Sequence, residues 1–142
     1  MPIDETRAKK VGELLTALKS DVSQLRTYAA MSSDEFSGDS DRQFAAKRVL
    51  QLAVERAKDI SDTLVGGPTG GRGRVRRLVD GNVIPRAQGD SFTVLTRLRN
   101  DLAHRYEGVS VSQVYKALQR APDRIDEFAQ CVTQYLEREG IA

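Results

Sequence analysis

The chain contains one histidine, His104, and the residues around it are types that act on phosphate esters. Arg99 and Asn100 precede it by five and four positions, and Tyr106 follows by two. An imidazole with an unperturbed pKa of about 6.5 moves a proton near neutral pH. A guanidinium binds phosphate through two parallel hydrogen bonds and stabilises negative charge where it develops. This set is compatible with cleavage of a phosphodiester, as when RNA is cut by attack of its own 2′-OH, a reaction that needs no metal ion.

Helical spacing limits how these groups can meet. Asn100 and His104 are four residues apart and share one helix face, so the amide could orient the imidazole or the 2′-OH. Arg99 lies about 140° from His104 on an ideal helix. For both side chains to act on one phosphate, the arginine must reach far, the helix must be distorted, or a second subunit must complete the site. Arg99 and Tyr106 share a face. The alternative interpretation is that His104 has a structural role, because a lone histidine on a helix is more often structural than catalytic.

Positive charge is concentrated before and within this motif. The formal net charge is only +2, yet residues 66–106 hold eight arginines and three aspartates, a local charge of +5 that leaves −3 elsewhere. Arginine presents a planar fork that matches phosphate, so a polyanionic partner is plausible. The favoured interpretation is a solvated connector rather than an RNA contact for four of these arginines, Arg72, Arg74, Arg76 and Arg77. The candidate RNA contacts are Arg72, Arg74, Arg76, Arg77, Arg97 and Arg105.

Composition excludes several classes of protein. The 142 residues are the length of one domain, which we expect to span 1–142. One cysteine and one histidine cannot build a disulfide framework or a usual zinc site. Gly66 and Gly71 have P-loop spacing, but Arg72-Gly73 stands where Lys-Ser/Thr is needed. We therefore expect no cofactor, no metal and no membrane span, and a cytoplasmic location.

Hydrophobic periodicity predicts helices throughout. The i, i+3, i+4 pattern indicates helices over about 4–30, 41–64 and 90–108, a short helix from 110 or 112 to 118, and a last helix that Pro122 starts or kinks. Residues 32–41 break the pattern with acidic residues that are typical of a helix start, and 66–89 look irregular apart from one helical turn at Val75–Val79. The fold class is therefore an all-α bundle of four principal helices plus a short one.

Individual side chains are first assigned to packing. Phe44 falls in the apolar stripe of the second helix, and Glu55 lies beside that stripe as a rim residue expected to pair with a basic neighbour. Cys131 and the tyrosines at 28, 115 and 135 are interpreted as core residues. The acids Asp34, Glu35, Asp39 and Asp41 miss the order of an EF-hand loop.

The full pattern Arg99-Asn100-x-x-x-His104-x-Tyr106 resembles the R-x4-H-x-Y signature of HepT-type toxins of the all-helical HEPN superfamily. Phe36 and the run from Arg42 to Glu55 resemble the family's second-helix opening. Residues 108–118 resemble the family's segment after the motif, and residues 122–136 are similar to its last helix.

This resemblance implies a homodimeric, metal-independent ribonuclease toxin whose two motif helices form a composite site. Arg99, Asn100 and His104 would be its catalytic residues. Its partners would be RNA and a small nucleotidyltransferase antitoxin, which silences the toxin by attaching AMP to the motif tyrosine, Tyr106. The alternative from another class is a non-catalytic helical subunit that binds and regulates a nucleotidyltransferase.

Overall fold

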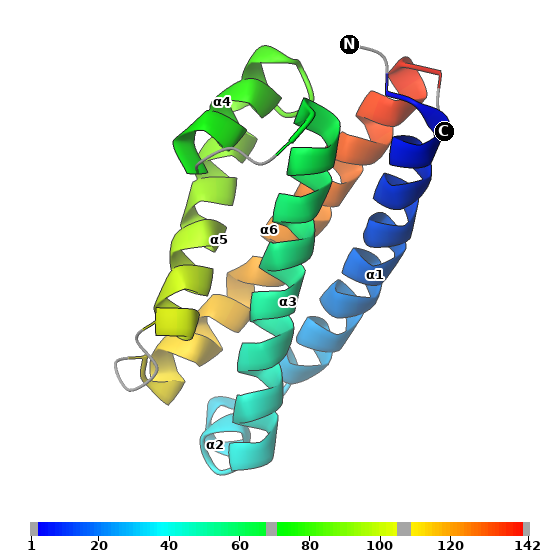
Figure 1. The fold of residues 1–142 in the computed structure, drawn as a ribbon. Helices are drawn as coiled ribbons and strands as arrows, with labels where there is room; N and C mark the ends of the chain where they lie inside the picture. The colour runs from blue at the N-terminus through cyan, green and yellow to red at the C-terminus, as the bar shows by residue number, and fades with distance from the viewer. Residues whose placement is uncertain (1–2, 68–70, 105–108, 141–142) are drawn as a thin grey trace.

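The computed structural model describes residues 3–67, 71–104 and 109–140, without the side chains of Arg72 and His104. This part of the chain is all-helical and contains no strand (Figure 1). The predicted all-α bundle is confirmed. Its elements are α1 (Glu5–Ala29), α2 (Ser33–Ser37), α3 (Ser40–Val65), α4 (Gly71–Asp80), α5 (Arg86–His104) and α6 (Val111–Arg138).

The core lies where the long helices α1, α3 and α6 pack together, and α5 closes it beside α3 and α6 (Figure 1). Each helix contributes the apolar stripe that its sequence period predicts. Leu18, Leu25, Leu50, Ile60 and Ile125 are completely buried there. This packing holds α5, which carries the motif, against the middle of α3.

Short polar side chains cap the starts of the helices. Asp4 accepts a hydrogen bond from the backbone N–H of Arg7 at the start of α1, and Asp39 accepts one from that of Arg42 at the start of α3. Ser32 and Glu35 form a reciprocal capping box that starts α2, a one-turn helix that periodicity did not predict. The acidic segment 32–41 therefore caps two helices in succession.

The connector between α3 and α5 differs from the prediction. Helix α3 ends at Val65, and the following Gly66 has φ of 90°. Residues 71–80 then form the complete helix α4 rather than one helical turn. Leu78 is fully buried, and Gly89 of α5 lets the two helices approach so closely that an added Cβ would lie 2.9 Å from Val75. Tertiary packing therefore stabilises a helix whose glycines disfavour it.

Two further predictions were wrong. The expected short helix and last helix form one continuous helix, α6, which begins after a capping box made by Ser110 and Gln113 and runs through the buried Pro122. Proline removes one backbone donor, and burial of Leu118 and Ile125 on either side sustains the helix. Phe44 is 58% exposed, because it lies about 200° around α3 from the buried Ala46.

No helix in the described ranges is both long enough and apolar enough to cross a membrane.

Candidate functional site

Arg99 reaches sideways from α5 to α3. Its Nη2 donates a hydrogen bond to Oε1 of Glu55 at 2.9 Å, and Nη1 lies 3.4 Å from Oδ1 of Asn100. The Arg99 side chain is 23% exposed and that of Glu55 is 38% exposed. Within the described residues, the buried Nε of Arg99 has no hydrogen-bond partner. Glu55 therefore orients the guanidinium through its Nη2.

Glu55 is a rim residue with a basic partner, as its sequence position predicted. Sequence reasoning did not identify that partner as the motif arginine, which lies 44 positions away. Such an ion pair is charge-assisted and half-buried, so it is stronger than a typical exposed pair. It links the motif helix α5 to the middle of α3.

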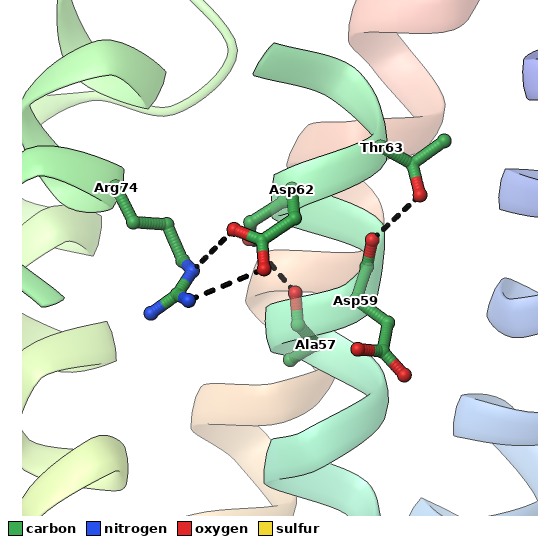
Figure 2. A network of polar contacts seen from close by, with 6 residues as sticks. Ala57, Asp59, Asp62, Thr63 and Arg74 are labelled. Carbon is green, nitrogen blue, oxygen red and sulfur yellow. Dashed lines mark hydrogen bonds and ion pairs between the residues drawn. The ribbon is translucent and has the colours of Figure 1, made fainter. Parts of the chain in front are cut away.

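A second ion pair lies further along α3. Asp62 accepts hydrogen bonds from Nε and Nη2 of Arg74 at 2.8 and 3.2 Å. Figure 2 shows Arg74 reaching across from α4 to this carboxylate. Lys58 lies between Glu55 and Asp62 in the sequence of α3. Burial lowers the pKa of Lys58, and the charges of Arg74 and Arg99 lower it further against the opposing effect of Asp62 and Glu55.

The predicted RNA-contacting arginines have different environments. Arg97 is exposed on α5, and Arg76 is 84% exposed with only a long 3.8 Å contact to Asp80. Arg77 donates a hydrogen bond to the carbonyl oxygen of Val65 at 2.9 Å, so part of its guanidinium holds α4 to the end of α3. These three remain candidates for RNA contact.

Arg74 is a correction to the predicted set. It is 7% exposed, and its guanidinium is occupied by Asp62. Its position one turn before the buried Leu78 directs it toward α3. Arg74 is therefore a structural residue, and a solvated connector was the wrong interpretation for this arginine. The Arg72 side chain and the whole of Arg105 lie outside the described residues.

Asn100 lies in the last turns of α5. Asn100 is exposed, and its oxygen faces the Arg99 guanidinium. His104 is the last residue of α5, and its side chain lies outside the described residues, as does all of Tyr106. The structure thus brings Arg99, Asn100 and Glu55 together. The participation of His104 and Tyr106 stays a prediction from the motif.

A separate groove of about 440 Å³ lies between α5 and α6. Val94 and Leu98 contribute apolar surface, and Lys116, Arg120 and Arg124 line it from α6. Leu98 points to this side of α5, whereas the neighbouring Arg99 points to α3, so the groove and the Arg99 site are distinct. Within the described ranges, no group of three or more His, Cys, Asp or Glu side chains is arranged to hold a metal ion.

Comparison with known proteins gives consistent matches over most of the chain. Residues 18–132 match the family model described as "Ribonuclease HepT-like". A tRNA nuclease HepT of Aphanizomenon flos-aquae is 24% identical, and the match covers 94% of this chain and 90% of that protein.

Solved structures share the fold at low sequence identity. The tri-AMPylated HEPN toxin of Shewanella oneidensis, solved in complex with MNT antitoxin, superposes with a TM-score of 0.77 at 18% identity, over 88% of this chain and 97% of that one. A cytosolic protein of unknown function from Bacillus subtilis superposes with a TM-score of 0.74 at 20% identity, over 99% and 96%.

Proposed function

Because the chain belongs to the HepT-like ribonuclease family, we propose that it is a metal-independent endoribonuclease and the toxin of a toxin–antitoxin pair. The observation that carries this proposal is the motif arginine, Arg99, whose guanidinium is oriented by Glu55 in a basic segment. The tRNA nuclease named among the relatives supports RNA as the substrate.

The reaction needs only the RNA and protein side chains. The 2′-OH attacks the adjacent phosphorus, its proton passes to a base, and the P–O5′ bond breaks as the leaving oxygen takes up a proton. The products are a 2′,3′-cyclic phosphate and a 5′-OH. His104 transfers a proton in this scheme, and Arg99 stabilises the charge that develops on the phosphoryl oxygens.

The direction of Arg99 supports a site shared between two copies. Arg99 reaches to Glu55 of α3, whereas position 104 lies about 140° around an ideal helix from position 99. One helix therefore does not readily direct both groups to one phosphate. In a homodimer with facing α5 helices, the histidine of one copy and the arginine of the other could act on the same phosphodiester, with Asn100 orienting the attacking or leaving oxygen.

Regulation is the second part of the proposal. A HEPN toxin with the same fold has been solved in a tri-AMPylated state with MNT antitoxin. We propose that a nucleotidyltransferase antitoxin attaches AMP to Tyr106 of this chain. Tyr106 follows Arg99 by seven residues in the sequence, and we propose that a nucleotide attached to it blocks the phosphate site.

The function is tested with purified protein and a mixed tRNA substrate. Wild-type protein should cleave the RNA in EDTA and leave 2′,3′-cyclic phosphate ends, while His104→Ala should not. Loss of cleavage in EDTA would overturn the metal-independent mechanism. Coexpression with a cognate nucleotidyltransferase antitoxin should add the mass of AMP to Tyr106, and finding it on serine or threonine would refute that assignment.

A further inference from the structure

The face of α3 that meets α4 and α5 carries charged residues one helical turn apart. Glu55 holds Arg99 of α5, and Asp62 holds Arg74 of α4. Lys58 lies between these two carboxylates, about 4.5 Å along the helix axis from Glu55 and about 6 Å from Asp62. The row is therefore acid, base, acid, with one arginine attached at each end.

The charges in this row do not balance. Arg74, Arg99 and Lys58 contribute three positive charges, and Glu55 and Asp62 contribute two negative charges. Each carboxylate is bound by an arginine, whereas Lys58 forms no ion pair within the described residues. Its side chain is half-buried and retains access to solvent. The unbalanced charge therefore belongs to Lys58, next to the motif arginine.

We propose that Lys58 is a second phosphate-binding residue, which takes the RNA phosphodiester adjacent to the one that Arg99 holds. This inference rests on the proposed function, since it extends the same site by one nucleotide. The RNA backbone would follow α3 from Glu55 toward Asp62. Lysine suits such a position because its mobile ammonium can meet a phosphate without a fixed geometry.

The unbound protein supports this role, because the Lys58 charge is unfavourable there. Burial and the neighbouring Arg74 and Arg99 both lower the pKa of Lys58. A residue whose charge opposes folding is typical of a binding site, where a ligand supplies the missing opposite charge. A phosphate anion would remove the repulsion among the three cations.

The test is the salt dependence of RNA binding, measured in a His104→Ala background so that the RNA stays intact. Binding of a fluorescent single-stranded RNA is titrated across a range of salt concentrations for Lys58→Met, Lys58→Gln and Lys58→Arg. Lys19→Met is the matched control, since Lys19 is exposed on α1. Circular dichroism checks that each variant is folded.

Loss of one phosphate contact should reduce the slope of log K against log salt by about 0.7 for a single strand. Lys58→Met and Lys58→Gln should show this reduction and bind about two- to tenfold more weakly. Lys58→Arg and Lys19→Met should keep the parental slope.

If folded Lys58→Met and Lys58→Gln proteins keep the affinity and slope of the His104→Ala parent, the inference is wrong. This holds even if the wild-type protein cleaves tRNA. A chain that neither binds nor cleaves RNA would overturn the proposed function and this inference with it. Cleavage by the wild-type protein and RNA binding by the His104→Ala protein therefore distinguish the two failures.

Discussion

The ion pair between Arg74 and Asp62 should decide whether α4 stays docked beside the candidate site. We consider Asp62→Asn, which keeps the size of the side chain and removes its charge. The Arg74 side chain is 8% exposed and donates two hydrogen bonds to the carboxylate. The substitution would leave a nearly buried guanidinium without its counter-ion.

The expected loss follows from this burial. Breaking one partner of a buried ion pair costs about 3–5 kcal/mol. Asp62 is 22% exposed, and the asparagine oxygen still accepts one hydrogen bond, so water and the amide reduce that loss. We expect the free energy of unfolding to fall by about 2–3 kcal/mol. For a protein of this length, Tm should fall by about 6–12 °C.

The same helix provides the control. Arg76 and Asp80 are 84% and 71% exposed and lie 3.8 Å apart, so Asp80→Asn should change stability by less than about 0.5 kcal/mol. Adding Arg74→Met to Asp62→Asn removes the unpaired buried charge. The double variant should recover about 1 kcal/mol or more of the loss.

Thermal and urea unfolding followed by circular dichroism would measure these differences, and hydrogen exchange would report on residues 71–80. Faster exchange in α4 than in α1 is expected for Asp62→Asn, because the lost contact is local to α4. An Asp62→Asn variant as stable as Asp80→Asn would refute the assignment of Arg74 as a structural residue.

Three further predictions concern the same framework. Gly89→Ala should destabilise the protein by about 1–2 kcal/mol, because its Cβ would lie 2.9 and 3.2 Å from two rigid valine side chains. Gly12→Ala places its Cβ where no atom lies within 4 Å and should stabilise the protein by up to about 1 kcal/mol. Urea unfolding would compare the two variants. Lys58→Met should be at least as stable as wild type at neutral pH, because the folded wild-type protein holds a charged lysine whose pKa is lowered by burial. This advantage should shrink as pH rises through the lowered pKa of Lys58 toward the ordinary value of about 10.4, since the lysine then loses its charge in the folded protein. A variant less stable than wild type at pH 7 would contradict the lowered pKa of Lys58. Glu55→Gln should lower kcat for RNA cleavage with a smaller change in KM, because the guanidinium of Arg99 loses its charged partner; an unchanged kcat would exclude Glu55 as a positioning residue.

Sequence periodicity predicts the long helices well because each buries a continuous apolar stripe. Asp4, Asp39 and Ser110 also mark helix starts, since a cap acts within one turn. Helix α4 could not be predicted in the same way. Its stability depends on the buried Leu78 and on an arginine that meets a carboxylate 12 residues earlier. Contacts of this kind are properties of the folded chain and leave no local pattern.

The candidate site shows the same division. The motif from Arg99 to Tyr106 is visible in the sequence because its residue types and spacing are local. The two α3 residues near the guanidinium, Glu55 and Lys58, are more than 40 positions away in the chain, and only the packing of α3 against α5 brings Glu55 to Arg99. The reach of the Arg99 side chain to Glu55 of α3 also requires the folded helix pair.

The most direct test of the proposed ribonuclease activity is RNA cleavage by the purified protein in EDTA, with Arg99→Ala and His104→Ala measured beside the wild type. We expect 2′,3′-cyclic phosphate products from the wild type and at least about a hundredfold loss of rate in each variant. Equal cleavage by the wild type and both variants, or no cleavage by the wild type, would contradict the proposal.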